Sequence, residues 1–135
     1  MNYNKKLNIT VFYCINAFNE KSALPFVEQG TVRITYVKMA CSSMVKDIYL
    51  LKAFEAGADH VVVFVCPEEA CRYIEGSIRA AKRVARVKGI LDEIGLGGNR
   101  LSIFNARLQD DGNIVKILNE TTARLTEMGP LFAAD

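Results

Sequence analysis

The sequence predicts a single α/β domain, residues 1–135, built on a four-stranded parallel sheet with helices on both faces. Three observations support this fold class. Short apolar runs alternate with longer stretches of helical periodicity, glycines follow those helical stretches, and one run is apolar on both faces, as in an inner strand of a parallel sheet. Right-handed crossovers between such strands favour a flavodoxin-like strand order of 2-1-3-4.

The apolar runs predict four strands. The clearest is His60–Cys66, in which β-branched and aromatic residues follow one another until Pro67 ends the run. The other three strands are expected at Leu7–Cys14, Thr31–Ala40 and Arg100–Ala106. The lone histidine, His60, is expected at the surface or at the strand end, away from any ligand role.

Helical periodicity predicts three helices in the later gaps, at Met44–Ala56, Ser77–Ile94 and Asp111–Met128. Ser43 is placed to cap the first of them, and Gly57, Gly95 and Gly129 follow the three helices as stop signals. The apolar stripes that they are expected to bury comprise Met44, Ile48, Leu51 and Phe54 in the first, Ile78, Ala81, Val84, Val87, Leu91 and Ile94 in the second, and Ile114, Leu118, Thr121, Leu125 and Met128 in the third. In the first gap, Ile15–Gly30, Pro25 favours a short helix or an irregular loop.

The composition excludes several classes of function. The net charge is +2 with 24% charged residues, which lacks the basic bias of a nucleic-acid-binding protein. No apolar run reaches the roughly 18 residues of a membrane span. The apolar stretch after the polar, basic start of the chain is short and lacks the small-residue cleavage site of a signal peptide. We therefore expect a cytoplasmic protein that binds neither nucleic acid nor membrane, in a compartment where cysteines serve more often as metal ligands or redox groups than in disulfides.

All four cysteines fall at predicted strand ends. Cys14 ends the first strand, Cys41 follows the second, Cys66 ends the third and Cys71 lies five residues later. Because parallel strands place their carboxyl ends at one edge of a sheet, these thiols are expected to converge there, where open α/β sheets bind ligands. Buried cysteines often serve only as small apolar residues. Four at strand ends and none in a helix favour instead a shared site for zinc or an iron–sulfur cluster, and the spacing is unlike the paired cysteines of a zinc ribbon.

Several stretches around these cysteines match one known family. They are Phe12–Cys14, Met39–Ser42, Leu51–Asp59, Cys66–Gly76, Arg83–Val84 and Leu91–Gly95. In this order along nearly the whole chain, they resemble the delta subunit of methyl-viologen-reducing hydrogenases, which is a small iron–sulfur protein. The most specific stretch is Cys66–Gly76, with the sequence CPEEACRYIEG.

The resemblance implies a role in electron transfer without independent catalysis. It implies a 2Fe–2S cluster held by Cys14, Cys41, Cys66 and Cys71, and transfer between a hydrogenase-like subunit and a flavin-containing, heterodisulfide-reductase-like subunit. The sequence departs from the family at two positions. Ala17 stands where the family has the second cysteine of a Cys-x-x-Cys pair, and Ser77 replaces a family asparagine. Four cysteines remain, the usual number for such a cluster. If the missing cysteine is a ligand in the family, this chain must substitute another group or hold no cluster.

Two other classes of function remain open. Cys66 to Arg72 satisfies the Cys-x5-Arg pattern of cysteine-dependent phosphatases, which need a low-pKa thiolate and backbone N–H groups that face phosphate. Glu68 and Glu69 would repel a phosphate and Pro67 removes an amide donor, which makes this the less favoured alternative. The other is a metal-free dithiol switch of Cys66 and Cys71.

A basic face is predicted on the second of the three helices, where Arg79, Lys82, Arg83 and Arg86 share one side. Such a face is most simply a solvated surface, and in the family role it is also a docking face for an acidic partner or a flavin phosphate. Leu131 and Phe132, after the last helix, are expected to fold back onto the core or to anchor on a partner.

Overall fold

The computed structural model describes residues 7–14, 32–39, 46–65, 75–105 and 111–129. Four strands form one sheet in the order β2-β1-β3-β4, and every neighbouring pair is parallel. The strands are β1 (Leu7–Cys14), β2 (Val32–Met39), β3 (His60–Val65) and β4 (Leu101–Asn105). The predicted fold class and strand order are therefore confirmed.

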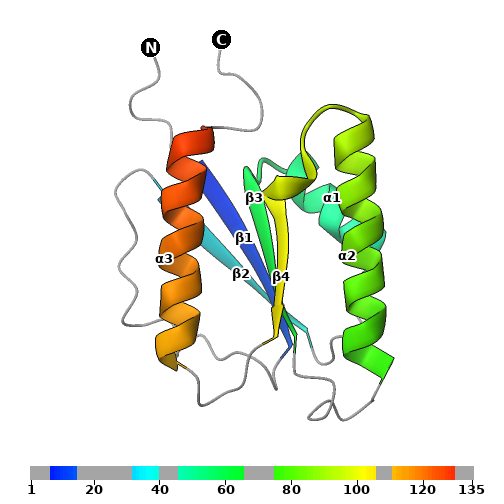
Figure 1. Cartoon of the computed structure of the whole chain (residues 1–135), viewed down its shortest axis with the longest axis horizontal. Helices are drawn as coiled ribbons and strands as arrows, with labels where there is room; N and C mark the ends of the chain where they lie inside the picture. The colour runs from blue at the N-terminus through cyan, green and yellow to red at the C-terminus, as the bar shows by residue number, and fades with distance from the viewer. Residues whose placement is uncertain (1–6, 15–31, 40–45, 66–74, 106–110, 130–135) are drawn as a thin grey trace.

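Helices cover both faces of this sheet. They are α1 (Asp47–Glu55), α2 (Glu75–Glu93) and α3 (Asp111–Met128), and a short 3-10 helix, η4 (Gly98–Arg100), leads into β4. Figure 1 shows α1 and α2 on one side of the sheet and α3 on the other. The strands end at the lower edge of this view, and both α2 and α3 begin there, so this lower edge is the carboxyl edge of the sheet.

The core divides into two clusters separated by the sheet. Ile9, Val11 and Val62 face α3 and pack with its Ile114 and Leu118, whereas residues of the opposite face pack under α1 and α2. All six residues of β3 are at most 1% exposed, because this strand has neighbours on both sides and helices over both faces. Burying each such aliphatic side chain contributes roughly 1.5–3 kcal/mol, so the centre of the sheet is the main source of stability.

The first helix differs from its sequence-based prediction. It begins at Asp47, and its N-cap residue is Lys46 in an extended conformation, so the predicted start at Met44 with a Ser43 cap is wrong. Leu50 and Phe54 face the core one turn apart, which turns Ile48 outward, and its side chain is 54% exposed. The end is as predicted, with Gly57 at a φ of 115° after the last turn.

The second helix and the turn after it also differ from the sequence-based prediction, which placed the helix at Ser77–Ile94. α2 runs over Glu75–Glu93 with Ala80 buried, whereas Ala81 and Ile94 of the predicted apolar stripe are exposed. The chain then approaches the helix so closely that a Cβ on Gly98 would lie 2.8 Å from the carbonyl oxygen of Lys88. Arg100 belongs to η4 and not to the strand, so β4 begins one residue later than predicted. α3 has the predicted bounds.

Several predictions fall on residues that the structure does not describe. These are the connection Ile15–Gly30, the segment around Ser43, and the tail with Leu131 and Phe132. The outer residues predicted for three strands, Thr31, Ala40, Cys66 and Ala106, also lie outside the described residues.

Candidate functional site

Of the four cysteines, Cys14 is the one that lies within the described residues, and it is at the carboxyl edge of the sheet. It is the last residue of β1, an inner strand, and it pairs in register with Met39, the last residue of β2. On the other side, Tyr13 pairs with Phe64, which puts Cys14 level with Val65, the last residue of β3. The side chain of Cys14 is 1% exposed and its thiol is free. The predicted position of Cys14 at the end of β1 is confirmed.

The other three predicted ligands, Cys41, Cys66 and Cys71, lie outside the described residues. Their convergence with Cys14 therefore stays a prediction, and so does the Cys-x5-Arg alternative from Cys66 to Arg72. Among the described residues, no group of three or more histidine, cysteine, aspartate or glutamate side chains could hold a metal ion. The described part of the edge contributes one thiol, Cys14, set between apolar strand ends.

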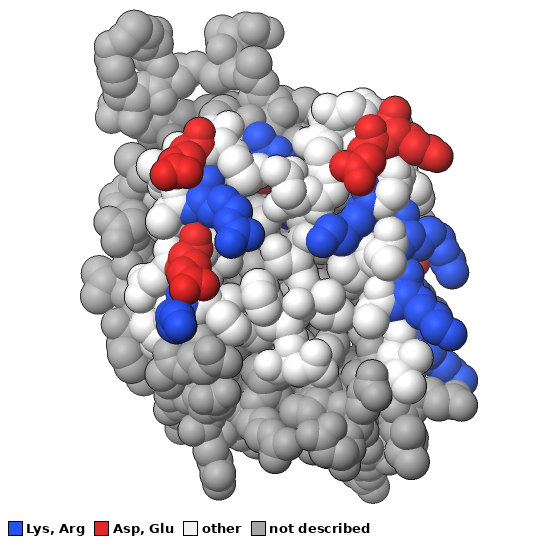
Figure 2. All heavy atoms as spheres, in the orientation of Figure 1, with Lys and Arg blue, Asp and Glu red and all other residues white. Residues whose placement is uncertain are grey.

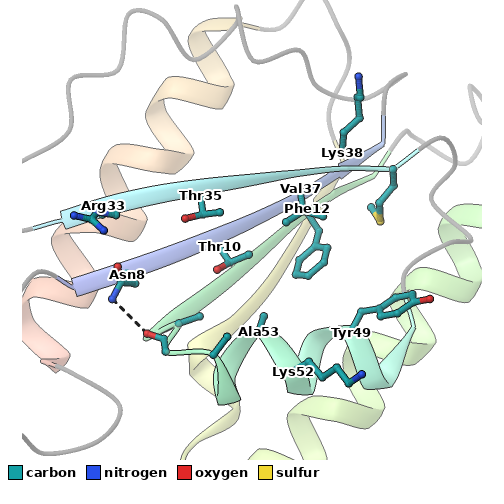
Figure 3. A pocket seen from close by; sticks show the side chains of 14 residues that line it. Asn8, Thr10, Phe12, Arg33, Thr35, Val37, Lys38, Tyr49, Lys52 and Ala53 are labelled. Carbon is teal, nitrogen blue, oxygen red and sulfur yellow. Dashed lines mark hydrogen bonds between the residues drawn. The ribbon is translucent and has the colours of Figure 1, made fainter.

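A groove between α1 and the outer part of the sheet was not predicted. It has a volume of about 790 Å³, and its floor is formed by alternate residues of β1 and β2, with α1 along one side. Figure 3 shows Thr10 and Thr35 on the floor, Arg33 and Asn8 toward one end, and Phe12 and Tyr49 toward the other. The residues that line it are Asn8, Thr10, Phe12, Arg33, Thr35, Val37, Lys38, Met39, Tyr49, Lys52, Ala53, Ala56, Gly57 and Ala58.

The groove exists because α1 does not cover the outer strand. On β2, Val32 and Ile34 are buried against the α3 side, whereas Arg33 and Thr35 point to the other face and are exposed. The sequence carried this signal, since the alternation of apolar and polar residues in β2 marks a strand with one solvated face. Arg33, Lys38 and Lys52 line the groove, and none of the lining residues that the structure describes is acidic.

The amino edge holds a polar network. The backbone N–H of Asn8 donates to the carboxylate of Asp59 over 2.8 Å, which fastens the start of β1 to the start of β3. The guanidinium of Arg100 donates to the carbonyl oxygens of Asp59 at 3.1 Å and Gly129 at 3.0 Å, and so joins β3 to the end of α3. Asp59 and Arg100 are both buried. These bonds satisfy polar groups at the edge opposite Cys14.

His60 lies at the same edge of the sheet, at a strand end, which was one of the two predicted positions. It starts β3 as expected, but its side chain is 1% exposed and not at the surface. The Nε2 atom lies 3.0 Å from the hydroxyl of Ser102, whereas the buried Nδ1 has no hydrogen-bond partner. Burial, reinforced by the positive charges of Arg124, Arg100 and Lys88, lowers the pKa of His60 to about 4. The ring is thus neutral at pH 7.

The basic face predicted on α2 is largely solvated. Arg79, Lys82 and Arg86 are exposed and Arg83 is half-buried, and Figure 2 shows a column of basic side chains along this helix. Arg86 forms an ion pair of 2.7 Å with Asp47 of α1. On α3, in contrast, acidic and basic side chains alternate along the visible face (Figure 2).

The parallel sheet, the 2-1-3-4 order and the cysteine at the end of an inner strand define an α/β protein of the doubly wound, flavodoxin-like class. A family model for the methyl-viologen-reducing hydrogenase delta subunit matches residues 9–129. The chain therefore belongs to this family, as the resemblance of the cysteine-flanking stretches predicted.

Named relatives point the same way. The chain is 38% identical over 101 residues to the vhu iron-sulfur subunit of the F420-non-reducing hydrogenase from Methanocaldococcus jannaschii, and the match covers 75% of this chain and 74% of the relative. It is 35% identical over 107 residues to the protein of the same name from Methanococcus maripaludis, where the match covers 75% of this chain and 80% of the relative.

A third relative is a much longer protein. Over 108 residues the chain is 33% identical to one of the subunits of the ferredoxin/F420H2-dependent CoB-CoM heterodisulfide reductase from Methanosarcina acetivorans. The match covers 76% of this chain but 14% of that protein. A segment similar to this chain is thus part of a larger redox protein in that organism. In the part of this chain that the structure describes, no helix is long and apolar enough to cross a membrane.

Proposed function

We propose that this protein is a cytoplasmic electron-transfer subunit in which Cys14, Cys41, Cys66 and Cys71 hold a 2Fe–2S cluster at the carboxyl edge of the sheet. The observation that carries the proposal is the register of the three strand ends. Cys14 lies level with Met39 and Val65 on the two neighbouring strands. In the sequence, Val65 directly precedes Cys66 and Met39 precedes Cys41 by two residues.

Covalent geometry supports a shared site. Neighbouring strands lie about 4.8 Å apart and consecutive Cα atoms about 3.8 Å apart, so covalent geometry limits the Cα atoms of Cys66 and Cys41 to roughly 9 Å and 12 Å from that of Cys14. Cys71 follows Cys66 by five residues, a span that can return to the same edge. Four thiolates are the usual ligand set of a 2Fe–2S cluster.

The surroundings of Cys14 fit such a group. The thiol is 1% exposed in an apolar cluster with Tyr13 and Ile117, so a cluster bound to it would be shielded from water on that side. Such shielding is one of the means by which a protein sets a cluster's reduction potential. When bound, the cluster would supply a one-electron carrier, and the residues of the chain would hold it and exclude water.

The names of the relatives support the kinds of partner. Iron–sulfur subunits of hydrogenases match most of the chain, and one heterodisulfide reductase polypeptide contains a similar segment within its own length. A segment that is fused to a protein in one organism commonly works beside it in another. We infer a hydrogenase-like donor and a flavin-containing, heterodisulfide-reductase-like acceptor for this protein.

A second candidate is a metal-free dithiol switch formed by Cys66 and Cys71. It is favoured by one observation, the presence of Ala17 where the family has a cysteine. If the family cysteine at this position is a ligand, the remaining thiols would bind iron poorly, and the closely spaced pair would be free to form a disulfide.

Anaerobic reconstitution with iron and sulfide tests the proposal. A 2Fe–2S site predicts roughly two irons and two sulfides per chain, with charge-transfer absorbance that dithionite bleaches. Each of the four variants Cys14→Ser, Cys41→Ser, Cys66→Ser and Cys71→Ser should lose most of this absorbance, because no spare cysteine can replace the ligand. The control Met39→Leu, at the same level of the sheet, should keep it.

Two results would decide against the cluster. A colourless wild-type protein in which mild oxidation links Cys66 to Cys71 would leave the dithiol switch as the function. Full iron content in the Cys14→Ser variant would remove the one described thiol from the ligand set and contradict the assignment.

A further inference from the structure

We propose that the groove between α1 and β2 is the docking surface for an acidic, partly apolar segment of the redox partner. This inference rests on the proposed function, because it assigns a surface to the partner protein. It adds the location and chemistry of the contact. Three features of the described residues carry it: the charge of the groove, the apolar side chains at its rim, and its position relative to Cys14.

The first feature is the charge. Arg33 extends from β2 and Lys52 from α1, so cationic side chains enter the groove from both sides (Figure 3). The threonine hydroxyls of Thr10 and Thr35 between them can donate hydrogen bonds to carboxylates. None of the described lining residues is acidic, so no described carboxylate cancels the positive charge within the groove. An occupant that carries carboxylates would be attracted and aligned by it.

The second feature is a cluster of exposed apolar side chains. Val37 is 36% exposed and Tyr49 is 49% exposed. Both line the groove, so two of the four large apolar side chains exposed among the described residues lie in it. Apolar side chains bounded by charges are characteristic of protein-binding surfaces, and tyrosine is a frequent anchor in them.

The third feature is the distance to the proposed cluster. Met39 lines the apolar end of the groove and is also the register partner of Cys14. A segment bound in the groove would therefore lie beside the carboxyl edge, one strand away from Cys14. Electron transfer needs the donor and acceptor groups to be held close, and a partner docked here would be positioned for it.

The shape favours a protein segment over a small molecule. From Arg33 to Met39 the floor follows β2 for about 20 Å, at roughly 3.3 Å per residue. Small-ligand sites enclose most of the ligand surface, whereas Arg33, Thr35 and Val37 on the floor of this groove are exposed. A partner helix of about 13 residues has a matching length and could lay one face in it.

Site-specific photo-crosslinking tests the location. A benzoylphenylalanine is introduced in place of Tyr49 in the full chain, and separately in place of Ile94 as the control. Ile94 is a similarly exposed apolar residue, 59% exposed, at the far end of α2. After irradiation of the co-purified complex, mass spectrometry should identify a crosslink from position 49 to a partner peptide rich in aspartate or glutamate. Position 94 should give no crosslink to that peptide.

Charge reversal tests the chemistry. The double variant Arg33→Glu/Lys52→Glu should reduce recovery of the identified partner protein at least about tenfold near physiological salt, because like charges would then face each other. Lys116→Glu, on an exposed position of α3 across the sheet, is the matched control and should assemble like the wild type. Equal thermal unfolding midpoints would show that both variants fold.

The outcomes separate this inference from the proposed function. Normal assembly of the double variant, or a crosslink from position 49 to a peptide without carboxylates, would overturn the docking surface even if the cluster is present. A docking surface that passes both tests in a protein without iron would leave the inference standing and remove the cluster. If the isolated wild type binds flavin mononucleotide and Arg33→Glu/Lys52→Glu does not, the groove is a small-ligand site and the inference is wrong.

Discussion

At the amino edge of the sheet, buried polar side chains form hydrogen bonds, whereas at the carboxyl edge the thiol of Cys14 lies between the apolar last residues of the two neighbouring strands. Asp59, His60 and Arg100 are all at most 8% exposed, and their bonds reach β1, β4 and the end of α3. Cys14 instead lies between Met39 and Val65.

This comparison of the two edges indicates that the amino edge contributes to folding stability and the carboxyl edge to binding a redox group. Buried polar groups are costly unless each has a partner, so the bonds at the amino edge fix the relative positions of four elements. At the carboxyl edge, the described residues hold the thiol of Cys14 in a defined position. Substitutions at the amino edge should therefore change folding, and substitutions at the carboxyl edge should change the bound group.

The largest effect on stability is expected from Arg100→Leu. This variant leaves the buried carbonyl of Asp59 and the carbonyl of Gly129 without their donor, at about 1–3 kcal/mol each. We expect the free energy of unfolding to fall by about 3 kcal/mol in urea denaturation. Arg100→Lys keeps the charge but cannot donate to both carbonyl oxygens in the same geometry, so its free energy of unfolding should lie between those of the wild type and Arg100→Leu. A loss below about 1 kcal/mol would show that the network is not a stabilising centre.

The next effect is a pH dependence that originates from His60. Its pKa is about 4 in the folded protein and 6.5 when unfolded, so the unfolded chain binds more protons between these values. Stability is therefore fully present above about pH 6.5 and declines as the pH falls toward 4. By linkage, the expected loss between pH 7 and pH 5 is about 2 kcal/mol.

Urea denaturation of the wild type and of His60→Gln at the two pH values measures this contribution. His60 is the one histidine of the chain, so the variant removes all histidine titration. The difference between the two proteins in how the free energy of unfolding changes with pH gives the contribution of the His60 ring. If both proteins lose the same stability between pH 7 and pH 5, His60 does not titrate as its burial implies.

A smaller effect on stability is expected from Cys14→Ala at the opposite edge. The substitution removes one small buried side-chain atom, and we expect the metal-free protein to lose about 1 kcal/mol. Iron binding, in contrast, should be lost almost entirely if Cys14 is a ligand. A loss of stability as large as that of Arg100→Leu, together with unchanged iron content, would reverse the proposed roles of the two edges.

The smallest effect is expected from Arg86→Ala. Its ion pair with Asp47 links α2 to α1, but the arginine side chain is 65% exposed. Exposed ion pairs of this kind contribute about 0–1 kcal/mol and weaken with salt. A cost well above about 1 kcal/mol, unchanged at high salt, would show that this surface contact matters more than its exposure indicates.

The sequence-based predictions were accurate for features that depend on residues close together in the chain, and less accurate for features that depend on contacts between distant residues. The strands and the 2-1-3-4 order were predicted because apolar runs, helical periodicity and right-handed crossovers are local or general rules. The start of α1 was predicted three residues too early, because the backbone of Lys46 is extended and the helix begins at Asp47 without a side-chain cap. Periodicity likewise assigned Ile48 and Ile94 to buried stripes, although both side chains are exposed in the folded protein.

The candidate site shows the same division. Cys14 was predicted at the carboxyl edge because it ends an apolar run, and strand polarity alone places it there. The alternation of apolar and polar residues in β2 indicates one solvated face, but the groove also depends on where α1 packs, which the sequence pattern does not give. The burial of His60 depends on Ser102 and Arg100, which lie about 40 residues later in the chain.

The sequence by itself determined most of the elements, the family and the residues that are candidates for ligands, because these follow from local periodicity and from short motifs, and it favoured the strand order that the structure has. Only the tertiary structure decided that Cys14 is level with Met39 and Val65, that Arg33 and Lys52 face one groove, and that His60 is buried and neutral. The physical reason is that register, coverage and burial arise from contacts between residues far apart in the chain.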